Sequence, residues 1–171
     1  LSGQTHAELQ LPAFNGSLTG MYDCVVTNTL GSVTTNEVSM DLVTHGPALD
    51  DVTRAWYGHG EAYWQADIME KVAGSSSLRS GAIGDSARSE FKATFTGPGT
   101  LRYWRKLSTE EGFDFLRVRV NGNLVHEVSG LRGWEAATLP LPAGTNTVSW
   151  SYEKNERFIF LDDAVWIDDV H

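Results

Sequence analysis

Cysteine, basic charge and long apolar runs are all scarce in this sequence of 171 residues. The single cysteine, Cys24, excludes an internal disulfide framework and any metal site built from several cysteines. No apolar run approaches the ~20 residues that a membrane-spanning helix requires. Only 13 Lys and Arg stand against 22 Asp and Glu, a net charge of −9 that argues against nucleic acid as a partner.

Catalytic motifs are missing as well. The sequence has no Gly-x-Ser-x-Gly, no His-Glu-x-x-His and no glycine-rich phosphate loop, and its five histidines are dispersed. We therefore expect a protein that is not an enzyme. A pair of carboxylates for glycoside hydrolysis has no sequence signature, so a hydrolase or lyase stays as a third hypothesis that a turnover assay decides.

The residues that are present follow the pattern of a folded all-β protein. Apolar residues alternate with polar ones in segments 89–95 and 116–120, and Asn121-Gly122 is a strong signal for a two-residue hairpin. We expect turns at 97–99 and 142–144. Short strands at regular spacing are typical of a β-sandwich or jelly roll.

One region, residues 62–73, has a competing pattern. Ala62, Ala66, Met69 and Ala73 fall on one face of a hypothetical helix. The sequence leaves this segment open between helix and strand.

Composition divides the chain near residue 46. Residues 1–46 contain no Lys or Arg, and the turn-prone segment 44–47 separates them from a mixed-charge remainder. The first part, 1–45, predicts three short strands, at 7–11, 21–27 and 33–43. The second part, 47–171, is nearly all strand.

The segment GMYDCVVTN resembles the F-strand region of an immunoglobulin-like domain, with Tyr22 two residues before Cys24. The following LGSVTTNEVSMDLV is similar to the G strand of bacterial Ig-like repeats. There is no room for the A to D strands. Either this part was cut from a longer chain, which the start at Leu1 favours, or another chain supplies the missing strands. In both cases we expect Cys24 to be a buried free thiol.

Six short motifs occur in order in the second part: Ser80-Gly81, Gly97-Pro98-Gly99, Asp114-Phe115-Leu116, Ser129-Gly130 with Trp134, Pro142-Ala143-Gly144 and Trp166-Ile167-Asp168. As a set they make residues 47–171 resemble a bacterial MAM-like, concanavalin-like jelly-roll module. Such modules occur in large secreted or surface proteins, which implies an extracellular or cell-surface setting. The resemblance implies a jelly-roll β-sandwich preceded by a partial Ig-like β-sandwich.

The function expected from this resemblance is non-catalytic binding or adhesion, with a polysaccharide or glycoconjugate as the partner. The alternative is a structural spacer or filament subunit whose incomplete Ig-like half is completed by another copy or chain. An oligomer would favour the alternative.

Aromatic residues supply the first candidate site, because flat rings stack on sugars. The candidates cluster around Gly58 and Gly60: Trp56, Tyr57, His59, Tyr63 and Trp64. Simple edge packing is the competing interpretation. We expect the other four tryptophans to fill the core: Trp104, Trp134, Trp150 and Trp166.

Arginines supply a second candidate. Arg105, Arg117 and Arg119 lie on two segments predicted to be neighbouring strands, where they would form a basic stripe for a uronate or sulfated glycan. The alternative is that nearby acids such as Asp114 neutralise them in cross-strand pairs.

Paired aspartates supply a candidate metal site. Asp50-Asp51 and Asp168-Asp169 lie near the two ends of the second part, which commonly meet in a jelly roll. Calcium prefers oxygen ligands, so these four residues predict a structural Ca²⁺ site. Alternatively, one Asp of each pair caps a turn. In a strand, Asp168 and Asp169 would point to opposite faces.

Overall fold

The computed structural model describes residues 20–40, 45–156 and 161–171, and the chain divides into two units, Leu1–Leu42 and Val43–His171. The described part of the first unit consists of two antiparallel strand pairs: β1 (Gly20–Tyr22) with β4 (Val38–Met40), and β2 (Val25–Asn28) with β3 (Gly31–Thr34). The strand predicted at 7–11 lies outside the described residues.

Cys24 is free but exposed, so the prediction of a buried thiol is wrong. Between residues 21 and 37 every side chain except that of Tyr22 is exposed, because the two strand pairs form a narrow ribbon. Val25, Val26 and Val33 are 58%, 64% and 72% exposed.

The second unit is built from one short helix and eight strands in its described residues. In chain order these are α1 His45–Ala48, β5 Trp56–Gly60, β6 Gln65–Asp67, β7 Ser77–Arg79, β8 Arg88–Ser108, β9 Phe115–Val120, β10 Asn123–Ser129, β11 Leu131–Glu153 and β12 Ala164–Asp168. They form a single sheet in the order β10-β9-β11-β8-β12-β7-β6, with β5 also pairing with β8. All the pairs are antiparallel.

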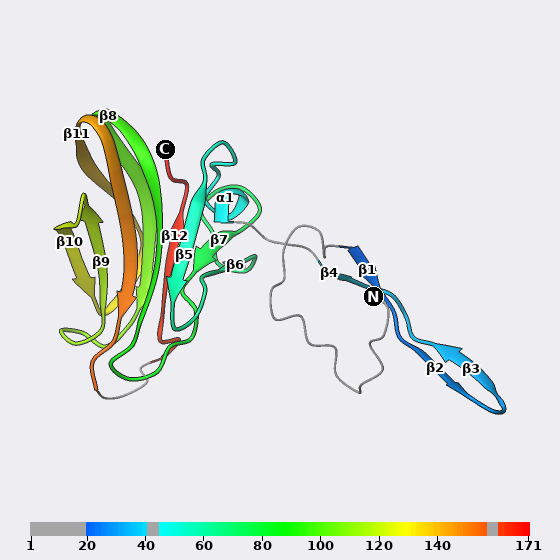
Figure 1. Ribbon diagram of the computed structural model, residues 1–171. Coiled ribbons are helices and arrows are strands. Elements are labelled where there is room, and N and C mark those ends of the chain that lie inside the picture. The colour runs from blue at the N-terminus through cyan, green and yellow to red at the C-terminus, as the bar shows by residue number, and fades with distance from the viewer. Residues whose placement is uncertain (1–19, 41–44, 157–160) are drawn as a thin grey trace. The chain divides into compact units, whose positions relative to one another are not determined.

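The sheet curls because β8 and β11 each belong to two layers. The first half of β8 pairs with β5 and its second half pairs with β12, while the second half of β11 pairs with β9. Both strands bend at the top of Figure 1, where residues 97–99 lie opposite 141–144. The turns predicted there are wrong, because the two segments pair with each other and the strands continue through the bend.

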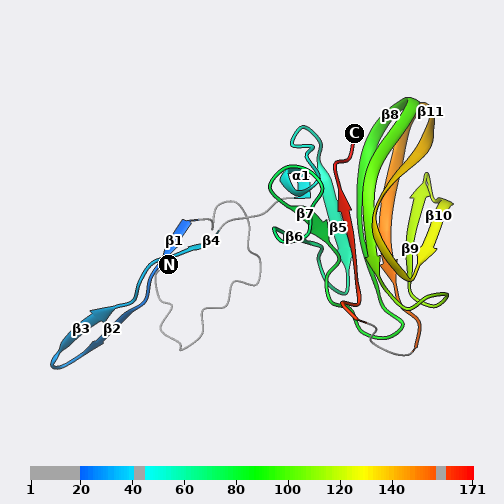
Figure 2. The same ribbon diagram turned by 180° about the vertical axis from the view of Figure 1, so that it is seen from behind.

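The result is a two-layer sandwich. The first layer is β10-β9-β11-β8-β5, and the second is β11-β8-β12-β7-β6. In both views β9 and β10 lie at one side of the unit, whereas β6, β7 and α1 lie at the other (Figure 1, Figure 2). The predicted all-β, β-sandwich class is confirmed.

Buried aromatic rings join the two layers. Phe91 and Trp150, from β8 and β11 of the first layer, stack with ring centroids 5.0 Å apart. Tyr103, from the second half of β8, meets Trp150 edge-on at 5.7 Å, and Trp64 meets Phe91 edge-on at 4.7 Å. All four side chains are buried, so the core lies between the layers.

Local sequence signals account for much of this arrangement. Along β9 the buried residues are Leu116, Val118 and Val120, as the alternation predicts. Asn121 and Gly122 both have positive φ, 52° and 82°, which is the conformation of a tight hairpin turn. Residues 62–73 form no helix, and Met69 on the hypothetical apolar face is 83% exposed. Among the described residues, no helix is long and apolar enough to cross a membrane.

Candidate functional site

One surface of the first layer, here called the five-strand face, carries two rows of polar side chains on β5, β8, β11, β9 and β10. Strand register aligns them as Tyr57, Lys92, Ser149 and Arg119 in one row and Glu90, Ser151, Arg117 and Glu127 in the other. Their neighbours along the strands, such as Phe91 and Val118, belong to the core, so both rows point away from it. Five strands at ~4.8 Å spacing make the face about 19 Å wide.

Glu153 connects the arginines of this face. Its carboxylate accepts hydrogen bonds from Arg117 Nη1 at 2.5 Å and from Arg119 Nη1 at 2.8 Å, and Ser151 Oγ donates to it at 2.7 Å. Arg117 also binds Glu127, 2.7 Å from Nε to Oε2. The Glu153 side chain is only 17% exposed, so the network holds the guanidinium groups in fixed positions.

The network also stabilises the charged forms of Glu153 and Arg117. Burial would raise the pKa of Glu153, but hydrogen bonds from Ser151, Arg119 and Arg117 outweigh it and lower that pKa. Burial would lower the pKa of Arg117, but Glu127 and Glu153 raise it. With Arg88 included, the face holds four basic residues (Arg88, Lys92, Arg117, Arg119) against three acidic ones (Glu90, Glu127, Glu153). This local excess of positive charge occurs on a chain of net charge −9.

The aromatic residues predicted as a binding site around Gly58 do not share one surface, because successive side chains of β5 point to opposite faces of the sheet. Tyr57 is 60% exposed on the five-strand face. Tyr63 is 68% exposed, and its ring lies beside Gly58. His59 pairs through its backbone with Glu90.

Trp56 and Trp64 do not join this surface. Trp64 is 4% exposed, and Trp56 is half-buried with its ring against Phe91, Phe95 and Trp150. The structure does not bring these two indoles to the surface predicted for them, because both pack against the core between the layers.

The four remaining tryptophans have different environments. Trp150 is fully buried in the core, as expected. Trp166 is 3% exposed but lies outside the core cluster, and Trp104 and Trp134 are half-buried.

Arg105 is separated from Arg117 and Arg119. It lies on the second half of β8, which belongs to the second layer, and its Nε donates to Glu135 at 2.7 Å. The structure therefore does not bring Arg105 into one stripe with Arg117 and Arg119, since the bend in β8 carries it away from the other two. Carboxylates do pair with all three arginines, but they come from neighbouring strands rather than from the 110–114 segment.

The four aspartates of the predicted calcium site are only partly brought together. Asp51 points to Arg54, 2.6 Å from Oδ2 to Nε. Burial raises the pKa of Asp50, and the nearby charges of Asp168 and Asp169 raise it further. Asp168 already accepts backbone N–H groups from Val72, Ala73 and Asp169.

In the part of the chain that the structure describes, no group of three or more His, Cys, Asp or Glu residues is arranged to hold a metal ion. The calcium site stays a prediction.

Sequence reasoning found Tyr57, Arg117 and Arg119 but missed the other residues of the five-strand face: Arg88, Glu90, Lys92, Glu127, Ser149, Ser151 and Glu153. Each lies next to an apolar residue in a segment where polar and apolar side chains alternate, so the sequence does show that they share the polar side of their strand. The cross-strand register that aligns them was not visible, because it depends on how two strands of 21 and 23 residues pair.

Comparisons with known proteins concern the fold. No protein-family model matches this sequence, and no curated protein matches it either. Among solved structures, the secreted serine protease VesC from Vibrio cholerae is similar with a TM-score of 0.57 and 19% identity over 84% of this chain. This chain spans only 30% of VesC.

A second similar structure is the K2 cleaved adhesin domain of Lys-gingipain. Its TM-score is 0.52 and its identity 17%, over 75% of this chain and 92% of the adhesin domain. At these identities the likeness shows a shared β-sandwich fold and nothing finer.

Proposed function

We propose that this chain is a non-catalytic carbohydrate-binding or adhesion module of a larger secreted or cell-surface protein. Its ligand is a polysaccharide or glycoconjugate that lies along the five-strand face. The observation that carries this proposal is the partly exposed group of Lys92, Arg117 and Arg119, which strand register aligns beside the exposed ring of Tyr57. The adhesin domain that shares its fold supports the proposal by analogy.

The chemistry of the face suits a hydroxyl-rich ligand. A sugar offers both donors and acceptors, and its binding is strongest when the protein groups are held in place before it arrives. The Glu153 network does this for Arg117 and Arg119, and Tyr57 adds an aromatic surface for stacking. Lys92 forms no ion pair among the described residues, so its charge is available to the ligand.

The charge of the face favours an anionic glycan, with uronate or sulfate groups. A local excess of basic side chains on an acidic protein concentrates negative ligands at that surface. A catalytic role fits less well. The lowered pKa of Glu153 keeps it ionised, so it is a poor general acid near neutral pH.

A glycan array, run with calcium and again with EDTA, tests the proposal. We expect binding to an acidic glycan, weakened about tenfold by Tyr57→Ala because one ring contact is lost. Phe113→Ala is the matched control, since Phe113 is 55% exposed but lies outside the five-strand face. No binding in either condition, or equal binding by the Tyr57→Ala protein, would refute the proposal.

A second function, the spacer completed by another chain, is favoured by the first unit. Val25, Val26 and Val33 are each more than half exposed, which leaves apolar strand surface for a partner to cover. Light scattering on the purified chain separates the two proposals: strand exchange requires a dimer or larger assembly, whereas the binding module requires none.

A further inference from the structure

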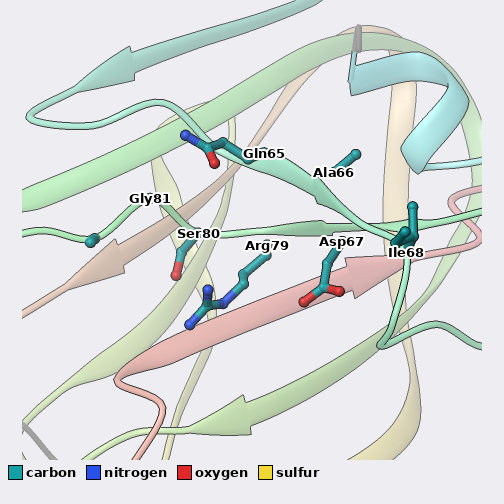
Figure 3. A pocket seen from close by; sticks show the side chains of 8 residues that line it. Gln65, Ala66, Asp67, Ile68, Arg79, Ser80 and Gly81 are labelled. Carbon is teal, nitrogen blue, oxygen red and sulfur yellow. The ribbon is translucent and has the colours of Figure 1, made fainter. Parts of the chain in front are cut away.

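A hollow of about 390 Å³ lies on the outer side of the second layer, at β6 and β7. Its lining includes Gln65, Asp67, Arg79 and Ser80, which Figure 3 shows gathered over β6, β7 and β12. Its volume is within the range of small-molecule sites in proteins. It lies on the opposite layer from the five-strand face.

Strand register explains how the hollow is built. Gln65 on β6 lies opposite Arg79 on β7, and Arg79 lies opposite Trp166 on β12. The Arg79 guanidinium lies over the ring of Trp166, 5.4 Å from its centroid. The Nε1 of the same indole donates a hydrogen bond to Asp67 Oδ2 at 2.8 Å. The indole thus forms the floor beneath the arginine.

Arg79 is incompletely satisfied by the protein. Its Nη2 donates to the Asp162 carbonyl at 3.2 Å, and its Nε is buried with no hydrogen-bond partner. Within the described residues no carboxylate lies within ion-pair distance of it, whereas Arg54, Arg88, Arg105, Arg117, Arg119 and Arg132 all have one. An arginine that lines a hollow and has no carboxylate within ion-pair distance is suited to bind the carboxylate of a ligand.

Asp67 limits which anion fits. Its Oδ1 accepts the backbone N–H groups of Met69 and Glu70, and its Oδ2 accepts the indole N–H of Trp166. One lone pair of Oδ2 therefore stays available for a hydroxyl donor. A carboxylate beside the arginine also repels a doubly charged phosphate. The ligand needs one negative charge together with hydroxyl groups.

We propose that this hollow binds a hexuronic acid unit. Its carboxylate lies on Arg79, and its hydroxyls donate to Asp67 and exchange hydrogen bonds with the exposed amide of Gln65. This is a second saccharide site, separate from the five-strand face and independent of its function.

The indole N–H of Trp166 provides a direct readout, because it is bonded to Asp67 under the arginine. Titration of the ¹⁵N-labelled protein with D-galacturonate or D-glucuronate should shift this resonance saturably. Arg79→Gln should weaken the response at least about tenfold. Arg102→Gln should leave it unchanged, since Arg102 is an exposed arginine of the same layer that does not line the hollow.

Gln65→Ala provides a second variant in case the Arg79 substitution disturbs folding, because Gln65 is exposed. It should weaken binding with the spectrum otherwise retained. D-galactose, acetate and inorganic phosphate are the comparison ligands. No saturable shift with either uronate, or an equal shift with galactose, acetate or phosphate, would overturn the proposal.

Discussion

Replacing Glu153 by Gln tests the ion-pair network of the five-strand face. The substitution keeps the shape of the side chain but removes the charge that Arg117 and Arg119 share, at 2.5 and 2.8 Å. The three side chains are 17%, 25% and 23% exposed, which places the network between a surface pair and a buried one. Surface pairs contribute up to about 1 kcal/mol, and breaking a buried pair costs about 3–5 kcal/mol. We expect a loss of about 2–3 kcal/mol at pH 7.

Urea unfolding followed by circular dichroism measures this loss. Glu127→Gln is the matched control, because Glu127 is 42% exposed and, among the described residues, pairs with Arg117 alone. The loss of stability should therefore stay below about 1 kcal/mol. In the thermal scan Glu153→Gln should lower Tm by about 6–9 °C, at roughly 3 °C per kcal/mol for a unit of this size.

The pH dependence follows from the lowered pKa of Glu153. A carboxyl whose folded-state pKa is depressed contributes stability above its unfolded pKa of about 4.3, and this contribution disappears as pH falls through the folded pKa. Wild type and Glu153→Gln should therefore converge in acid. If Glu153→Gln cost no more than Glu127→Gln at pH 7, or if the difference persisted at acid pH, the reasoning would fail.

Three further substitutions probe the core and the acidic cluster. Trp150→Ala should cost about 3–5 kcal/mol, since the ring is fully buried, and Trp104→Ala, at a half-buried position, should cost clearly less in the same urea titration. Asp50→Asn should raise the stability by less than about 1 kcal/mol in EDTA, because it removes a charge that burial and the charges of Asp168 and Asp169 disfavour. The backbone should not be strained, since Asn tolerates the φ of 56° at this position. This gain should fade as pH falls and the wild-type carboxyl takes up its proton. If calcium binds there, it should raise the Tm of wild type but not of Asp50→Asn; equal Tm for wild type in calcium and EDTA would refute the calcium prediction.

The sequence predicts strands well where burial alternates along one short segment. Leu116, Val118 and Val120 show the period of two directly, and Asn121-Gly122 marks the hairpin because few other residues accept two positive φ values in succession. These signals are local, so a sequence contains them completely.

Features that depend on pairing between distant segments cannot be predicted from the local sequence. Residues 97–99 look like a turn because Gly and Pro favour one, yet pairing with 141–144 keeps them in β8. The same bend sends Arg105 to the second layer. Tyr57 and Trp56 could be assigned to opposite faces from alternation, but which face becomes core is decided by the strands packed against them.

The two shared strands also determine how this unit should respond to mechanical load. In a sandwich of separate sheets, the layers can slide apart by breaking side-chain contacts alone. Here β8 and β11 run through both layers, paired with each other along nearly their whole length. One layer therefore cannot slide past the other unless these two strands straighten at the bend or lose their backbone hydrogen bonds. Under tension the second unit should therefore resist a sliding of one layer past the other.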